Sequence, residues 1–338
     1  MQGRVGFCCK WIDGPDQIDG FKPGDAAREL NTRVTTVAWL NRQSRADAEQ
    51  RLWDLMVHNI DSIHKLVERV GGLDANRRMV RLGSDILPVY TESTWSYFWQ
   101  RPDVQAYAEK AFLQVGEAAR RLDVRLSFHP GQFTVLASDN DLIVERSIAE
   151  FEYHADMIRY MGFGQRFQDF KCNVHIAGKQ GAAGIKKVLP RLSTEARNTI
   201  TIENDEMRHG LDASLELVDH CALVLDIHHH WVRTGEYIEP TDDRVKRIID
   251  SWRGERPALH YSVSREDYLV GHDPDVRPDM ANLLDVGYKK SKLRAHSDFY
   301  WNNAVNDWAL SFADNFDIQC ESKAKNLARD QLINYWKT

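Results

Sequence analysis

The stretch TITIENDEMRHGLDASLELVDHCALVLDIHHH, residues 199–230, decides the fold class of this chain. It contains two short apolar runs, Thr199–Ile202 and Ala222–Leu225, and each has the length of a buried strand. The segment between them, Leu211–Cys221, repeats its apolar residues with the period of a helix. A strand, a helix and a second strand in this order predict a unit of a parallel sheet, because parallel strands need a crossover connection.

The same alternation continues in both directions along the chain. Strands are predicted at Val5–Cys9, Met79–Leu82, Val124–Phe128, Cys172–Ile176, Thr199–Ile202, Ala222–Leu225, Ala258–Tyr261 and Phe316–Cys320. Helices are predicted at about 45–70, 104–122, 142–161, 185–192, 211–221, 245–252 and 304–312, and in a last segment that ends near Trp336. A long, irregular and partly basic segment runs from 262 to about 295. Eight strands with helices between them favour a closed α/β barrel, a single (β/α)8 domain of the TIM type over residues 1–338. Alternation alone also allows a doubly wound open sheet.

Composition narrows the class of protein further. The chain has 338 residues and five cysteines, and no two of the cysteines have CxxC spacing. We expect reduced, packed cysteines and therefore a cytoplasmic protein. The sequence shows no secretory signal and no long uncharged apolar run, so we expect no membrane contact. The net charge of −6 argues against a nonspecific nucleic-acid coat, although local basic runs exist at 289–294 and at 186–187.

Six successive predicted strands carry a histidine or a carboxylate at or near the end. These residues are His129, His175, Glu203, Asp226, His260 and Glu321. A single histidine on an apolar strand is usually a hydrogen-bonded core residue, but six such residues in register are not expected by chance. In a barrel the strand ends converge on one mouth, where active sites are built. The sequence therefore predicts a metal site at the C-terminal mouth.

Further residues extend this ligand set. His229 follows Asp226 by one helical turn, and we take it as a ligand with His228 and His230 as neighbours. His296 is a further ligand, with His272 as its rival. Nitrogen and oxygen ligands without sulfur suit Zn²⁺, Mn²⁺ or Fe²⁺. Eight ligands exceed the needs of one ion, so two or three ions are expected.

Glu203, central in strand order, is the natural bridge between these ions. Metals about 3.5–4 Å apart favour displacement at phosphorus. We expect Glu203, Asp226 and His229 to be the central catalytic residues of the metal centre.

At this point the motifs resemble a known family. HPGQF at 129–133, NVHIAG at 173–178, IENDE at 202–206 and DIHHH at 226–230 are similar to the ultraviolet-damage DNA endonucleases, which are relatives of the endonuclease IV apurinic endonucleases. The resemblance runs from about residue 4 to 325 and is weakest between 262 and 290. It implies a DNA-repair enzyme that nicks DNA immediately 5′ of pyrimidine dimers and 6-4 photoproducts, leaving a 3′-hydroxyl and a 5′-phosphate. It also implies up to three divalent ions, usually manganese, and a partner that is lesion-containing double-stranded DNA. We expect the enzyme to be a monomer.

The resemblance also implies roles for individual residues. His129, His175 and Glu203 would hold one ion. Glu203, Asp226, His260 and Glu321 would hold a second ion, and His229 with His296 a third. Gln132 and Phe133 match the pair that probes the duplex beside the lesion, where an amide and a ring fill the gap left by extruded bases.

Several positions depart from the family pattern or extend it. Phe133 and Phe7 stand where family members can have tyrosine, and both are expected near DNA. Trp11 is expected to line the DNA groove, whereas packing is the simpler interpretation for most of the other tryptophans. Ala258 lies two residues before His260, where some members carry a lysine that is modified beside the metals, so any role of that lysine cannot operate here.

Three other functions use similar residues. A sugar isomerase or epimerase on the same barrel also collects carboxylates and histidines around one or two metals, but it has no use for a third ion or a DNA-probing loop. An apurinic endonuclease without dimer activity would share the metals and differ in its lesion-facing loops. A noncatalytic DNA-binding barrel has no need for so many buried charges.

Overall fold

A computed structural model describes residues 3–18 and 25–337 of the chain, so residues 1–2, 19–24 and 338 of the predicted domain lie outside the described residues. The eight strands form one closed barrel in sequence order, and every neighbouring pair is parallel. The strands are β1 Val5–Cys9, β2 Met79–Leu82, β3 Arg125–Phe128, β4 Lys171–His175, β5 Ile200–Glu203, β6 Ala222–Asp226, β7 Ala258–Tyr261 and β8 Asp317–Cys320. The predicted barrel is confirmed and the open sheet is excluded.

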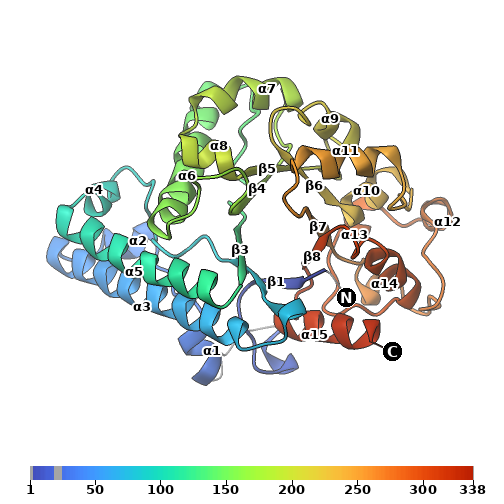
Figure 1. Cartoon of the computed structure of the whole chain (residues 1–338), viewed down its shortest axis with the longest axis horizontal. Coiled ribbons are helices and arrows are strands. Elements are labelled where there is room, and N and C mark those ends of the chain that lie inside the picture. The colour runs from blue at the N-terminus through green and yellow to red at the C-terminus, as the bar shows by residue number, and fades with distance from the viewer. Residues whose placement is uncertain (1–2, 19–24, 338) are drawn as a thin grey trace.

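Helices surround the barrel and cover its outer face (Figure 1). The longer ones are α3 Arg45–Gly71, α5 Pro102–Arg121, α6 Asp141–Tyr160, α7 Gly181–Val188, α10 Ile227–Thr234, α11 Asp243–Ser251, α14 Asn303–Leu310 and α15 Lys325–Trp336. The shorter ones are α1 Asp25–Leu30, α2 Val37–Leu40, α4 Ser96–Trp99, α8 Thr194–Thr199, α9 Leu211–Leu215, α12 Met280–Asp285 and α13 Lys290–Leu293. The helix predicted over 211–221 ends at Leu215, and the segment predicted as irregular, 262–295, contains α12 and α13.

Side chains at the strand ends also begin helices. Asp226, the last residue of β6, is the N-cap of α10, and its Oδ1 accepts a hydrogen bond from the backbone N–H of His229 at 2.7 Å. The three consecutive histidines 228–230 are therefore the first turn of a helix. This hydrogen bond holds the backbone of His229 close to the Asp226 carboxylate.

Alternation along the strands lines the barrel interior with polar side chains. On β4, Lys171, Asn173 and His175 face the same side, because successive side chains on a strand point to opposite faces. Asn173 hydrogen-bonds to Glu203 of β5, and Thr201 Oγ1 donates to Asn173 Oδ1 at 2.7 Å. The interior is thus a stack of hydrogen-bonded layers that leads up to the strand ends.

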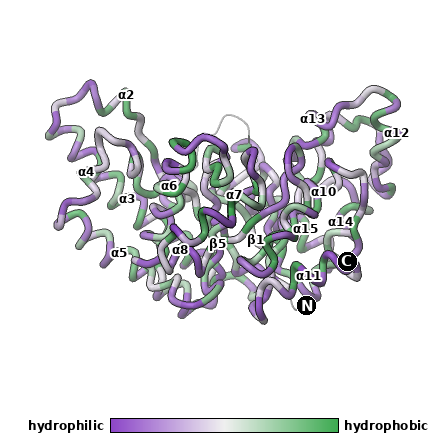
Figure 2. The backbone as a smooth tube through the Cα atoms, turned by 90° about the horizontal axis from the view of Figure 1, so that it is seen from above, coloured by the Kyte–Doolittle hydropathy of each residue, from purple (hydrophilic) through white to green (hydrophobic). Residues whose placement is uncertain are grey.

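Two flanks rise on either side of the barrel when the molecule is seen from the side (Figure 2). One flank contains α2, after β1, and the other contains α12 and α13, after β7. Both belong to connections that leave the C-terminal ends of the strands. Within the described residues, no helix combines the length and apolar character that a membrane span requires.

The cysteines have the expected state. All five are free, and Cys8, Cys172, Cys221 and Cys320 are buried. Burial raises the pKa of the Cys221 thiol to about 12, so this side chain packs as a neutral apolar group.

A buried histidine predicts loss of stability in acid. His154 on α6 is fully buried, and burial lowers its pKa from 6.5 to about 4. Because the unfolded chain binds this proton below pH 6.5 and the folded chain does not, stability falls as the pH drops from 6.5 towards 4. At about 1.4 kcal/mol per pH unit, this residue alone should cost about 2 kcal/mol between pH 6.5 and 5.

The comparison is wild type against His154→Asn, unfolded by urea in chelator at the two pH values. The variant should lose about 2 kcal/mol less than wild type over this range. Equal losses in the two proteins would show that His154 does not carry the effect.

Candidate metal centre and DNA-facing surface

The strand ends bring the predicted ligands together at one end of the barrel. Among the described residues, ligand atoms within 4.8 Å of one another form three groups of three. The groups are His129, His175 and Glu203; Glu203, Asp226 and His260; and His175, Glu206 and His229. Seven residues from five strand ends and their following loops therefore converge on one centre.

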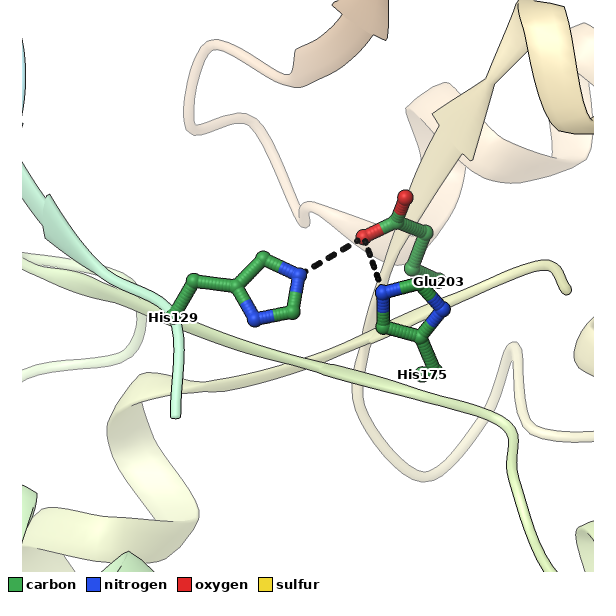
Figure 3. Close-up of side chains that lie close together, drawn as sticks. All are labelled: His129, His175 and Glu203. Carbon is green, nitrogen blue, oxygen red and sulfur yellow. Dashed lines mark ion pairs between the residues drawn. The ribbon is translucent and has the colours of Figure 1, made fainter. Parts of the chain in front are cut away.

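Glu203, at the end of β5, lies in the middle of this centre. Its Oε2 is 3.3 Å from His129 Nε2 and 3.9 Å from His175 Nε2, and both rings point at this oxygen (Figure 3). The same oxygen is 3.1 Å from His260 Nδ1, and Oε1 is 3.3 Å from His229 Nδ1. One carboxylate thus faces four imidazoles, as a bridging ligand would.

Three of the histidines are held by backbone carbonyls. The Nδ1 atom of His129 lies 3.0 Å from Pro130 O, that of His229 lies 3.0 Å from Asn204 O, and that of His296 lies 2.9 Å from Glu321 O. A carbonyl can only accept, so in each ring Nδ1 carries the proton and Nε2 keeps its lone pair. Histidine ligands of metals are generally oriented in this way.

Buried polar atoms without partners show that this centre suits a cation. Glu203 Oε1, Asp226 Oδ2 and His260 Nδ1 are buried and have no hydrogen-bond partner within the described part of the chain. An unsatisfied buried carboxylate is costly unless it is paired or coordinates a metal. The residues therefore fit a divalent ion.

Charge in the centre supports the same conclusion. Burial raises the pKa of Glu203, but the surrounding His260 and His175 outweigh this and hold its pKa well below the usual range. Burial lowers the pKa of His229, but Asp226, Glu203 and Glu206 raise it to about 10. The negative charge of three carboxylates thus converges on His229, and such a cluster suits a bound cation.

Glu321, at the end of β8, lies at the edge of the centre. Its Oε1 is 3.2 Å from His260 Nδ1 and also forms an ion pair with Arg81 of β2. Arg81 and Glu321 are nearly buried, with 14% and 10% of their side chains exposed. The sequence analysis did not identify Arg81 as a residue of the site. Arg81 lies near the C-terminal end of β2, and Glu321 directly follows β8.

Lys171 is a second missed residue. Its Nζ lies inside the barrel, 2.8 Å from His260 Nε2, and burial lowers its pKa to about 7. This contact occupies one nitrogen of His260 and leaves Nδ1 facing the carboxylates. Ala258 belongs to a buried apolar cluster with Met79 and Trp252. The lysine beside His260 in this chain therefore comes from β4 and not from position 258. The signal was present, since Lys171 is four residues before His175 and shares its face.

The structure distinguishes between the two candidate histidines of the 262–296 segment. His296 lines the pocket at the mouth together with His229 and Glu321. His272 lines a different pocket, its ring 6.1 Å from that of Trp301, and its Nε2 contacts Val276 O at 2.9 Å. His296 is therefore the residue placed for the centre.

The predicted DNA-contacting residues divide into two pairs. Gln132 and Phe133 are exposed in the loop that follows β3, and 85% of Phe133 is accessible. Phe7 is completely buried under Arg329, and Trp11 is 8% exposed with its ring 5.9 Å from Phe7. The expectation that Phe7 and Trp11 contact DNA is wrong for this structure, because Phe7 on β1 and Trp11, just after β1, both belong to the hydrophobic core.

Basic and acidic side chains both line the opening of the centre. A pocket of about 680 Å³ lies over the ligands and is also lined by Gln132 and Met207. Its basic lining residues are Arg81, Lys179, Arg208 and Arg294. Four carboxylates, Asp139, Asp205, Glu206 and Glu321, line the same pocket. Three of the basic residues are ion-paired with them: Lys179 with Asp139, Arg81 with Glu321 and Arg294 with Glu206. Arginine at the opening can still donate hydrogen bonds to phosphate oxygens.

Comparisons with known proteins point to one family. The model of the family "UV-endonuclease UvdE" matches residues 22–337. A UV DNA damage endonuclease of Bacillus velezensis is 26% identical over 72% of this chain and 75% of its own length. A UV-damage endonuclease of Schizosaccharomyces pombe is 25% identical over 99% of this chain and 51% of its own length.

Two solved structures share the fold. The crystal structure of SacUVDE superposes with a TM-score of 0.72 at 18% identity and covers 99% of this chain and 98% of that one. Endonuclease IV from Thermus thermophilus superposes with a TM-score of 0.53 at 15% identity, over 81% of this chain and 93% of that one. These likenesses confirm the barrel, and the family match over almost the whole chain shows that the protein belongs to the UV-endonuclease UvdE family.

Proposed function

We propose that this DNA-repair endonuclease nicks the phosphodiester backbone immediately 5′ of UV photoproducts, leaving a 3′-hydroxyl and a 5′-phosphate. Its substrate is double-stranded DNA that contains pyrimidine dimers or 6-4 photoproducts, and abasic sites are a further substrate. The observation that carries the proposal is the set of buried ligand atoms without hydrogen-bond partners, among the described residues, below a pocket that contains arginine side chains. The family match adds the class of substrate.

His129, His175 and Glu203 would hold one divalent ion, in agreement with one of the groups at the mouth. Glu203, Asp226 and His260 would hold a second with Glu321, whose Oε1 is 3.2 Å from His260 Nδ1. His229 with His296 would contribute to a third. Mn²⁺ is the ion we propose. Divalent ions at such a site supply a Lewis acid and a nucleophile at neutral pH.

The protein's own residues prepare the site for this chemistry. The carbonyls of Pro130 and Asn204 fix the ring orientations of His129 and His229. Arg294 and Arg208 at the rim attract the phosphate backbone. Gln132 and Phe133 enter the duplex beside the lesion, where damaged pairs are cheaper to unstack.

Incision of a defined duplex tests this proposal. One strand carries a single cyclobutane dimer, and undamaged and abasic duplexes serve as controls, each with Mn²⁺ and with chelator. We expect a metal-dependent nick just 5′ of the dimer. Cutting at the abasic site alone would favour an apurinic endonuclease without dimer activity, and no cutting by metal-loaded protein would reject the proposal.

Removing the exposed ring of Phe133 should weaken lesion recognition without disturbing the fold. Stacking of an aromatic ring on a base contributes about 1–3 kcal/mol, so Phe133→Ala should lower dimer incision about 10–100-fold. Since 85% of Phe133 is accessible, the melting temperature and the metal content should not change.

The matched control is Leu113→Ala, which removes a 43% exposed apolar side chain from α5 on the outer face of the barrel. Its incision rate should equal that of wild type. An unchanged rate for Phe133→Ala would remove this residue from the lesion contact.

A further inference from the structure

One carboxylate at the mouth has no part in the ligand roles given above. Glu206 lies in the loop after β5, three residues beyond Glu203, and only 10% of its side chain is exposed. Its ligand oxygen forms a group with His175 and His229 in which all the atoms lie within 4.8 Å of one another. It also lines the pocket that contains His296 and Glu321.

The orientation of His229 directs its free nitrogen towards this carboxylate. Because Nδ1 donates to the carbonyl of Asn204, Nε2 is the atom with the available lone pair. Nε2 is 3.7 Å from Glu206 Oε2. This separation is too long for a hydrogen bond, but it is less than twice a metal–ligand distance of about 2.1 Å. Two ligands of one ion are expected to be this far apart.

Glu206 is held in this position from two sides. Its other oxygen, Oε1, is 3.1 Å from Arg294 NH1, in the segment that follows α13. Its loop is fixed by Asp205, whose Oδ1 accepts from the N–H groups of Met207 and Arg208. Arg294 therefore holds one oxygen while the second faces His229.

Charge gives the reason for a third ligand here. His229 and His296 together supply two neutral imidazoles, which do not neutralise a divalent ion. His175 is shared with the group around Glu203, and a neutral imidazole has one lone pair, so it serves one ion at a time. Glu206 is the carboxylate within reach of His229 that is not committed to the other two groups.

We infer that Glu206 is a ligand of the ion held by His229, and that Arg294 positions its carboxylate. The inference rests on the proposed function, which requires metal ions at the mouth. With its own anionic ligand, this site holds its ion before DNA arrives and does not depend on a substrate phosphate to complete it. The third ion should therefore be bound in the free enzyme.

Metal analysis of the full chain without DNA tests the inference. Wild type, Glu206→Gln and the control Glu216→Gln are loaded with Mn²⁺, dialysed and counted by elemental analysis, with folding checked by circular dichroism. Glu216 is exposed on the same connection between β5 and β6 and lies outside the pocket lining. We expect Glu206→Gln to lose one ion per chain and Glu216→Gln to lose none.

A second variant keeps the result interpretable. Arg294→Gln should keep the wild-type number of ions and bind the weakest of them about tenfold less tightly, as expected for a partner outside the ligand shell. A wild-type ion count and affinity in Glu206→Gln would overturn the inference while leaving the proposed function intact. Wild-type protein that binds no Mn²⁺ would overturn both.

Discussion

Glu203→Gln is expected to abolish incision and the loading of the two ions whose ligand groups share this carboxylate. The carboxylate belongs to two of the three ligand groups, and it lies within 4 Å of nitrogens from four histidines. An amide of the same shape keeps the packing but removes the negative charge that the ions share. Metal-ion stabilisation of charge at phosphorus amounts to several kcal/mol, so incision should fall by about 10³-fold or more.

The measurement combines metal content with single-turnover incision of the dimer duplex. In chelator, circular dichroism should show that Glu203→Gln is folded like wild type, so that a loss of metal or activity is not a loss of fold. Thr201→Val, two residues earlier on the same inward face of β5, tests whether any change in this layer has the same effect. A fully loaded and active Glu203→Gln protein would refute the bridging assignment.

The sequence predicted the barrel because the fold depends on a repeated pattern. Eight apolar runs with helical segments between them leave few alternatives, and the strand bounds were right to within one or two residues. The convergence of His129, His175, Glu203 and Asp226 followed from the same topology, since parallel strands deliver their ends to one mouth. The positions of these four residues are set by the course of the main chain.

The parts that could not be predicted depend on side-chain direction across the barrel. Lys171 contacts His260 from a strand that is three positions away around the barrel, and nothing local to either residue indicates this contact. Phe7 was expected near DNA because it stands where family members can have tyrosine, but its neighbours Arg329 and Trp11 enclose it. Whether an aromatic residue on a strand is exposed or buried therefore depends on the helix that packs against it. For Phe7 this helix is α15, which contains Arg329.

Arg81→Met is expected to destabilise the protein strongly when no divalent ion is available. Burial raises the pKa of Glu321, but Arg81, together with His260 and His296, holds it well below its usual range. Removing one partner of a buried ion pair leaves an uncompensated charge and costs about 3–5 kcal/mol. In chelator, the melting temperature should fall by about 5–10 °C.

Divalent ions should reverse much of this loss, because a cation bound by Glu203, Asp226 and His260 lies beside the same carboxylate. We therefore expect Mn²⁺ to raise the melting temperature of Arg81→Met more than that of wild type. The double variant Arg81→Met with Glu321→Met should regain most of the stability in chelator, since apolar groups of similar volume replace a buried pair at little cost. If Mn²⁺ stabilised wild type and Arg81→Met equally, Glu321 would not link the ion pair to the metal centre, and the second ion would be held by Glu203, Asp226 and His260 alone.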